Sequence, residues 1–219
     1  LGLYAGALHT LTSGALLKRD ALQEVAGKLQ MSLNGLSALL NRLLDFSRLD
    51  VGQVEAHTQP VCIQKLVGGL QAEFVELART KGIRFSVAKT SLFAISDPVL
   101  LRQMLMNLAA NAVRYTSHGR VIIGCRRRKQ GREVEIQVWD SGIGIPMEKQ
   151  RIIFEAFQQA DAGTSRKYGG TGLGLSISRG LAELLGGSIE LESELEQGST
   201  FTLVLPLDYT PAKRETKGG

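Results

Sequence analysis

The sequence is short of cysteine, of aromatic residues and of long apolar runs, and each shortage excludes a class of protein. Its 219 residues include two cysteines, Cys62 and Cys125, and no Cys-His cluster, so we expect neither a disulfide framework nor a zinc site. Free thiols are typical of cytoplasmic proteins. No apolar run reaches membrane-spanning length and the first residues lack the layout of a signal peptide, so any membrane attachment is expected outside this chain.

A strong excess of one charge is also absent, because the formal net charge is +5 and aromatic residues make up 5% of the chain. The densest basic cluster, residues 126–129, lies beside a predicted turn, and we interpret it as a solvated hairpin end rather than a nucleic-acid site. With 43% hydrophobic and 21% charged residues, the chain can form one good core with an appendage, or two small domains. The polar segment 208–219 is expected to be a disordered tail.

The first fifty residues have the spacing of two helices. Residues 1–11 show a helical pattern without a cap, and Asp20 is expected to cap a second helix that continues to Asp50. Apolar residues recur along this second helix mostly at three- and four-residue steps: Leu22, Val25, Leu29, Leu33, Leu36, Leu40, Leu43 and Leu49. Because one short companion cannot cover so long a seam, we predict that two chains form a four-helix bundle. The alternative is packing of the seam on the rest of the same chain.

From Gln53 the composition changes, and Gln59-Pro60 is the expected boundary of a second unit. Alternation and turn residues predict strands at 60–63, 83–87, 92–96, 120–128, 133–140, 188–195 and 200–205. Helical periodicity predicts helices at 64–81, 98–115 and 172–185. The second of these starts with Asp97 as its cap and Pro98 at the first helical position. The interleaved order predicts an α+β fold in which a layer of helices covers one face of a mixed sheet.

The segment Asp140-Ser-Gly-Ile-Gly-Ile-Pro146 is the first candidate site. Strict alternation places Asp140 on the same buried face of its strand as Val138 and the apolar residues before it. We expect no local group to hydrogen-bond this buried carboxylate, so its partner is predicted to be a donor group of a flat ligand. Gly142 and Gly144 leave the backbone bare for that ligand. The alternative is a strand that ends in a turn with an Asx cap.

The helix predicted at 98–115 carries a second candidate site. Asn107, Asn111 and Arg114 line a face next to its apolar stripe. Amide oxygens are hard ligands suited to magnesium, and an arginine one turn away can contact the phosphates that the metal holds. The alternative is a polar helix edge that faces solvent.

A glycine-rich segment, residues 168–175, is the third candidate site. Its alternating glycines run directly into a predicted helix N-terminus: Gly170, Gly172 and Gly174. Free backbone N–H groups at that end of the helix dipole would hold a phosphate chain, although the spacing is neither that of a P-loop nor that of a dinucleotide fold. A flexible loop without a ligand is the alternative. Phe154 and Phe157 are expected to anchor the base of a mobile lid at 158–171.

Five ordered segments resemble the N, G1, F, G2 and G3 boxes of sensor histidine kinases of two-component systems. They are Asn107-Leu-Ala-Ala-Asn111-Ala-Val-Arg-Tyr-Thr116, Asp140-Ser-Gly-Ile-Gly144, Phe154-Glu-Ala-Phe157, Gly170-Thr-Gly-Leu-Gly174 and Gly198-Ser-Thr-Phe201. Residues 43–50 also resemble the end of the second helix of that family's dimerisation domain. The resemblance covers residues 1–206 and implies a partial dimerisation hairpin at 1–52 and a two-layer Bergerat ATP-binding domain at 53–207, followed by the tail at 208–219.

The resemblance also implies ATP and Mg2+ as cofactors and gives roles to single residues. Asp140 would hydrogen-bond the adenine amino group, Asn111 would hold magnesium, and Arg114 and the lid glycines would engage the phosphates. The residues implied in catalysis are Asn107 and Arg114. Those implied in nucleotide binding are Asn111, Tyr115, Asp140, Gly142, Gly144, Ile145, Arg166, Lys167, Gly170, Thr171, Gly172, Leu173, Gly174 and Thr200.

The sequence departs from this family at the phosphate acceptor. The His-Glu/Asp-hydrophobic-Arg-x-Pro box is absent, and the histidines present are His9, His57 and His118. His9 has no acidic neighbour to act as a base, and the other two are expected in loops, so we expect the acceptor just upstream of this chain. The predicted function is transfer of the γ-phosphate of ATP to a histidine of the parent's dimerisation helix. The alternative is a nucleotide-sensing interaction module that dimerises with another kinase and transfers nothing.

Two relatives of the fold are excluded by single features. Gyrase, MutL and chaperone ATPases carry a glutamate one turn before the magnesium asparagine, where this chain has Asn107, and an amide cannot act as a base for water. Anti-sigma serine kinases lack the leucine-rich helix at 21–50. We therefore predict a cytoplasmic kinase core, or the cytoplasmic part of an inner-membrane sensor. Its expected partners are a second copy through the hairpin and a response regulator receiver domain, without nucleic acid.

Overall fold

The computed structural model describes residues 19–128, 132–158 and 172–207. The first helix expected at 1–11, the hairpin turn at 129–131, most of the lid and the tail lie outside these residues. The chain divides into two compact units, Leu1–Asp45 and Phe46–Gly219. Within the described residues, no helix is both long and apolar enough to cross a membrane.

Helix α2 (Arg19–Asp50) is the described element of the first unit, and its last turn belongs to the second. The helix already includes Asp20, so the expectation that Asp20 precedes it as a cap is wrong. Of the predicted leucine seam, these members are exposed: Leu29, Leu33, Leu36, Leu40 and Leu43. The helix ends at Asp50, two residues before Gly52, whose φ of 69° is the left-handed conformation that glycine adopts without strain.

A five-stranded mixed sheet forms one layer of the second unit. Its strands, in the spatial order β2-β4-β5-β7-β6, are β2 (Ile83–Val87), β4 (Gly119–Arg128), β5 (Glu133–Asp140), β7 (Gly198–Pro206) and β6 (Ser188–Glu194). The pair β2 and β4 is parallel, and the other neighbours are antiparallel. A separate antiparallel pair is formed by β1 (Gln59–Cys62) and β3 (Phe93–Ser96). The mixed sheet and the predicted strands are confirmed, with ends that differ by one or two residues.

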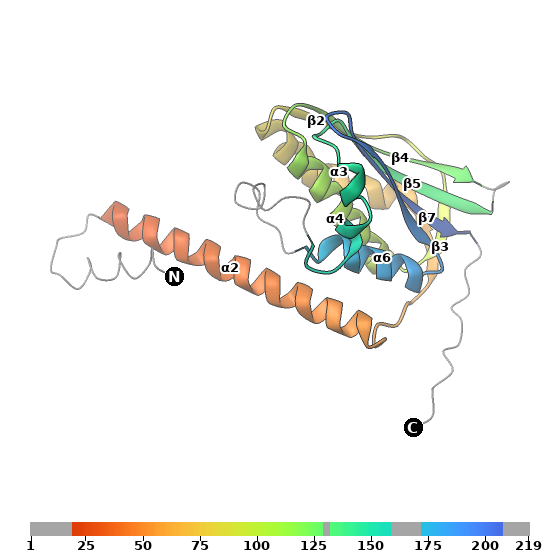
Figure 1. The fold of residues 1–219 in the computed structure, drawn as a ribbon, viewed down its shortest axis with the longest axis horizontal. Coiled ribbons are helices and arrows are strands. Elements are labelled where there is room, and N and C mark those ends of the chain that lie inside the picture. The colour runs from red at the N-terminus through yellow and green to blue at the C-terminus, as the bar shows by residue number, and fades with distance from the viewer. Residues whose placement is uncertain (1–18, 129–131, 159–171, 208–219) are drawn as a thin grey trace, which may run out of the picture. The chain divides into compact units, whose positions relative to one another are not determined.

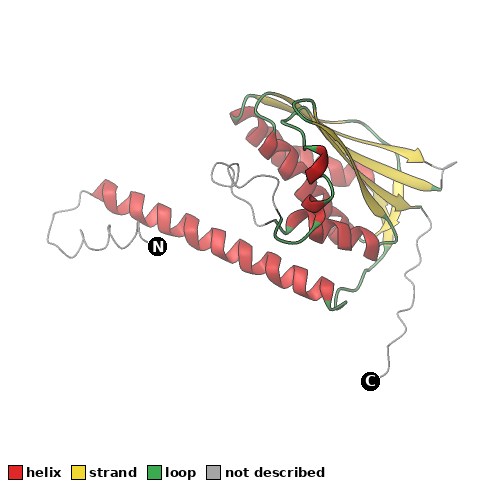
Figure 2. Cartoon of the chain, in the orientation of Figure 1, coloured by secondary structure: helices red, strands yellow, loops and turns green. Residues whose placement is uncertain are grey.

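Helices α3 (Ile63–Thr80), α4 (Pro98–Tyr115) and α6 (Gly174–Leu184) form the second layer. Figures 1 and 2 show them together on one face of the five-stranded sheet. Between β5 and α6 the chain makes two short 3-10 helices, η2 (Met147–Lys149) and η3 (Ile152–Phe154). The largest fully buried side chains lie between the layers and include Leu101, Leu105, Leu108, Ile123, Ile136 and Leu203. The predicted α+β two-layer fold is therefore confirmed.

Polar contacts fix both ends of α4, the helix that carries the second candidate site. Asp97 Oδ1 accepts the N–H groups of Val99 (2.8 Å) and Leu100 (3.0 Å), which confirms Asp97 as the cap before Pro98. At the other end, the Lys81 ammonium donates to the carbonyl oxygens of residues 113, 114 and 116. Because a cation there also opposes the negative end of the helix dipole, the last turn of α4 is firmly held.

The basic cluster at 126–129 is not simply a solvated hairpin end. Arg126 Nε lies 2.6 Å from Glu135 Oε2, and Arg128 Nε lies 3.2 Å from Glu135 Oε1. Arg128 Nη1 also lies 2.8 Å from Glu190 on β6. Glu135 is buried, so its charge requires these partners. Arg126 and Arg127 are exposed, as expected of a solvated hairpin end, while the ion pairs of Arg126 and Arg128 also join β4 to β5 and β6.

Candidate functional site

Asp140 is the last residue of β5, and its carboxylate lies on the core face of the sheet. The side chains two, four and six residues before it, on Val138, Ile136 and Val134, are fully buried, and Asp140 itself is 4% exposed. Its neighbours across the sheet are Val121 on β4 and Ser199 on β7. The prediction of a buried carboxylate on this face is confirmed, since period two holds to the end of the strand.

Two backbone N–H groups contact this carboxylate. Gly142 N donates to Asp140 Oδ1 at 2.8 Å, and the backbone of Ser199 also donates to the carboxylate. The expectation that no local group reaches it is therefore wrong, because the chain turns back within two residues, as in the Asx-cap alternative. Burial still dominates and raises the pKa of Asp140 to about 6, with the two N–H groups acting in the opposite direction. The site thus retains an incompletely compensated carboxylate.

The loop after Asp140 passes so close to its neighbours that it requires glycine twice. A Cβ atom on Gly142 would lie 2.6 Å from the carbonyl oxygen of Tyr115, and one on Gly144, where φ is 67°, would lie 1.9 Å from that of Glu194. Ile143 N donates to Tyr115 O at 3.3 Å. The loop 141–146 is therefore held between the end of α4 and the end of β6, and its two glycines are needed for this close packing.

The polar face of α4 is half-buried rather than turned to solvent. Asn107 Nδ2 donates to Gly174 O (3.4 Å) and to Ser178 Oγ (3.3 Å), so this amide joins α4 to α6. In the described parts of the chain, the amide of Asn111 has no hydrogen bond and the guanidinium of Arg114 has no acidic partner. Two half-buried polar groups are thus available to a ligand one turn apart on the helix that contacts the loop.

The register of β7 corrects one predicted residue. Ser199 pairs with Asp140 and Thr200 pairs with Trp139. Directly paired residues share a face, so Thr200 lies on the opposite face of the sheet from Asp140, and Ser199 replaces it in the candidate site. The signal was available, because Phe201, Leu203 and Leu205 are large apolar residues at alternate positions, and period two carries their buried face back to Ser199.

Of the glycine-rich segment 168–175, the described residues are Gly172, Leu173, Gly174 and Leu175. Gly172 has a φ of 69°, and its carbonyl oxygen accepts the N–H of Phe157 at 3.2 Å. Leu173 is fully buried, so its side chain belongs to the core and only its backbone can face a ligand. Four further residues predicted to bind nucleotide, in or just before this segment, lie outside the described residues: Arg166, Lys167, Gly170 and Thr171.

The two phenylalanines of the F box differ in environment. Phe154 packs edge-on against Phe201, with ring centroids 6.3 Å apart, as an anchor should. Phe157 is 62% exposed and has a φ of 65°, which is uncommon for a bulky residue. Its ring nevertheless packs edge-on against Phe46, with ring centroids 6.2 Å apart, and its backbone N–H donates to Gly172 O. Both phenylalanines therefore make contacts at the base of the predicted lid, and the ring of Phe157 is the more exposed of the two.

The described histidines are both in loops, as predicted. His57 is exposed in the segment before β1, and its backbone N–H donates to Asp97 Oδ2 at 2.8 Å. His118 is exposed in the turn before β4. His9 lies outside the described residues.

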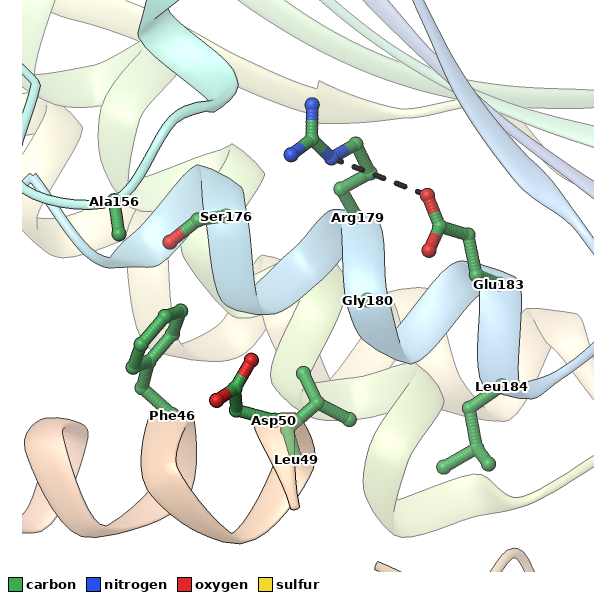
Figure 3. Close-up of a pocket in the computed structure, with 9 residues that line it drawn as sticks. All are labelled: Phe46, Leu49, Asp50, Ala156, Ser176, Arg179, Gly180, Glu183 and Leu184. Carbon is green, nitrogen blue, oxygen red and sulfur yellow. Dashed lines mark ion pairs between the residues drawn. The ribbon is translucent and has the colours of Figure 1, made fainter. Parts of the chain in front are cut away.

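A separate cavity of about 520 Å³ lies between α6 and the last turn of α2 (Figure 3). Phe46 and Leu49 line it from α2, and the Arg179–Glu183 ion pair (3.9 Å) lines it from α6. A Cβ atom on Gly180 would lie 2.5 Å from Leu49 Cδ2, so this glycine allows the close approach of the two segments. None of the residues predicted to bind nucleotide lines this cavity, so it is distinct from the site around Asp140.

Comparison with known proteins matches residues 96–209 to the family described as histidine kinase-, DNA gyrase B- and HSP90-like ATPases. The chain is 35% identical over 200 residues to the signal transduction histidine-protein kinase BarA of Escherichia coli, which is 89% of this chain and 21% of BarA. It is 34% identical over 201 residues to the sensory/regulatory protein RpfC of Xanthomonas campestris, which is 88% of this chain and 28% of RpfC. The chain thus spans less than a third of either relative.

Solved structures give the same match. The crystal structure of full-length ShkA in complex with AMPPNP superimposes with a TM-score of 0.76 and 32% identity, over 90% of this chain and 41% of that chain. Histidine kinase ThkA in complex with the response regulator protein TrrA gives a TM-score of 0.71 and 25% identity, over 95% of this chain and 57% of that chain.

Proposed function

This chain belongs to the family of histidine kinase-, DNA gyrase B- and HSP90-like ATPases and is homologous to sensor histidine kinases, and we propose that it binds magnesium-ATP around Asp140 and donates the γ-phosphate to a histidine. The observation that carries the proposal is the Asp140 carboxylate, which is 4% exposed and has a pKa raised to about 6. Such a group gains free energy from a ligand donor, and the adenine amino group is a donor.

The residues on α4 fit a magnesium-bound triphosphate. The described residues contain no group of three or more His, Cys, Asp or Glu side chains that could hold a metal. Magnesium needs few protein ligands, because phosphate oxygens and water complete its shell, so the amide oxygen of Asn111 suffices. When bound, the metal neutralises phosphate charge. Arg114, one turn further on and without an acidic partner among the described residues, would bind the phosphates beside it.

In this proposal, transfer depends on positioning and on charge neutralisation. Asn107 and Arg114 orient the phosphate chain, while the N–H groups at the start of α6 and the lid residues Arg166, Lys167, Gly170 and Thr171 enclose it. Fast hydrolysis of ATP is not expected, because Asn107 stands where a general base for water would be needed. Histidine needs no such base, since a neutral imidazole is already nucleophilic.

The remaining parts of the proposal concern the parent protein. The acceptor histidine belongs to its dimerisation helix, and residues 1–52, 53–207 and 208–219 form the partial hairpin, the ATP-binding domain and the tail. The exposed leucines of α2, among them Leu33, Leu36 and Leu40, would pair with those of a second copy in the cytoplasm. ThkA, whose structure resembles this chain, was solved with a response regulator. We propose a receiver domain of that class as the partner here.

Calorimetric titration with a non-hydrolysable ATP analogue, with and without magnesium, tests the proposal. Binding should depend on magnesium, and Arg114→Ala should weaken it at least tenfold. Arg102→Ala is the matched control, because Arg102 lies on the same helix and pairs with Glu73 on α3. The wild-type chain should also phosphorylate a separately supplied dimerisation helix that carries the acceptor box. Binding without phosphorylation of the supplied helix would favour the nucleotide-sensing interaction module, whereas absence of binding would refute the proposed site.

A further inference from the structure

Ser193, on the edge strand β6, is hydrogen-bonded to both segments that border Asp140. Its hydroxyl accepts the N–H of Ile145 (2.8 Å) in the loop 141–146 and donates to the carbonyl oxygen of Gly198 (3.0 Å) at the start of β7. It also lies 2.9 Å from the hydroxyl of Ser199. A hydroxyl has one proton to donate and two lone pairs, so Ser199 is the donor in that contact and Ser193 uses its full capacity.

Gln150, just after η2, provides a second hydrogen bond to the backbone of Ile145. Its Nε2 atom donates to Ile145 O (2.9 Å) and to Ser193 O (2.9 Å). Both polar backbone groups of Ile145 are therefore bound, one by the side chain of Ser193 and the other by that of Gln150. These contacts close the far end of the loop, beyond the two glycines.

The same network reaches the carboxylate. Ser199, which donates its hydroxyl to Ser193, also donates its backbone N–H to Asp140. On the other side of the loop, Ile143 O accepts the N–H of Glu196 (2.7 Å) in the turn after β6. The loop and the strand end that hold Asp140 are thus joined through one serine hydroxyl, and their spacing depends on it.

We infer that Ser193 is a positioning residue for recognition of the nucleotide base, because it fixes the loop 141–146 relative to the Asp140 carboxylate. This inference rests on the proposed function. The carboxylate accepts a hydrogen bond from the amino group of adenine, whereas guanine presents a carbonyl oxygen at the equivalent position. The choice between the two bases therefore depends on a fixed distance between the loop 141–146 and the Asp140 carboxylate. A loosened loop would admit water and other orientations of the base.

Ser193→Ala is expected to weaken binding of a non-hydrolysable ATP analogue about tenfold, since it removes the partner of Ile145 N and the link to Ser199. The ratio of ATP to GTP affinity should fall severalfold as well. Ser193→Thr keeps the hydroxyl on a strand that tolerates β-branched residues and should restore both quantities. Ser188→Ala is the control, because Ser188 lies on the same strand, is exposed and makes no side-chain hydrogen bond within the described residues.

The experiment is calorimetric titration of the four proteins with both nucleotide analogues, together with their thermal midpoints. Wild-type protein that binds neither analogue would refute the proposed function. If wild-type protein binds but Ser193→Ala keeps the wild-type affinity and ratio, the inference alone is refuted. A Ser193→Ala variant that loses affinity for both analogues equally, with an unchanged ratio, would reduce Ser193 to a support of the fold and would also overturn the inference.

Discussion

Asp140→Asn is expected to separate the stability of the fold from its ability to bind nucleotide. The pKa of this carboxyl rises from 3.8 to about 6 in the folded chain, mainly because the group is buried. One pKa unit corresponds to about 1.4 kcal/mol, so the ionised carboxylate costs the folded state about 3 kcal/mol. Asparagine removes the charge and keeps an oxygen that accepts the N–H of Gly142. The variant should therefore be more stable than wild type at pH 7, by about 1 to 3 kcal/mol.

The pH dependence gives the sign of this effect. Between pH 4 and pH 6 the folded state binds more protons at Asp140 than the unfolded state does, because its pKa is the higher one. The contribution of this carboxyl to the free energy of unfolding is therefore fully present below pH 4 and is lost as the pH rises through 6. Asp140→Asn should lack this loss, so its advantage over wild type should shrink as the pH is lowered.

Urea denaturation at several pH values measures the stability, and calorimetry with the ATP analogue measures binding. Nucleotide affinity of Asp140→Asn should fall about 100-fold, because the charged acceptor for the base amino group is gone. Glu148→Gln neutralises an exposed carboxylate nearby and should change neither quantity. A variant that is less stable than wild type at pH 7, or that binds the analogue normally, would refute the reasoning.

The affinity of the wild-type chain for the ATP analogue should fall about tenfold between pH 7 and pH 5, because Asp140 takes up a proton with a pKa of about 6. Calorimetry should show that the affinity of Asp140→Asn lacks this pH dependence. Gly142→Ala places a Cβ atom 2.6 Å from Tyr115 O. It should therefore lower the free energy of unfolding by about 1 to 3 kcal/mol and reduce the affinity for the ATP analogue at least tenfold. Gly68→Ala meets nothing within 4 Å and should be neutral or stabilising, or else the steric argument fails. Asp97→Ala removes the acceptor of three N–H groups and should cost about 1 to 3 kcal/mol in urea denaturation without changing nucleotide affinity; a change in affinity would contradict its purely structural role.

Local signals in the sequence determined the elements and the central residue of the site. Alternation along residues 134–140 predicted the buried carboxylate because side chains of a strand alternate in direction whatever packs on them. The pair Asp97-Pro98 predicted the start of α4 because a cap acts on N–H groups two and three residues away. Both signals act within a few residues, so no tertiary contact was needed to interpret them.

The tertiary structure alone decided how the polar groups of the site are shared. Ser193 and Gln150 gave no signal in the sequence, since the groups that they bind lie up to 48 residues away along the chain. The amide of Asn107 is partly used to join α4 to α6, 67 residues further on. The register of β7 with β5 places Ser199, and not Thr200, directly beside Asp140. Hydrogen bonds between distant elements depend on the packed arrangement of the sheet and helices, and a local pattern carries no record of that arrangement.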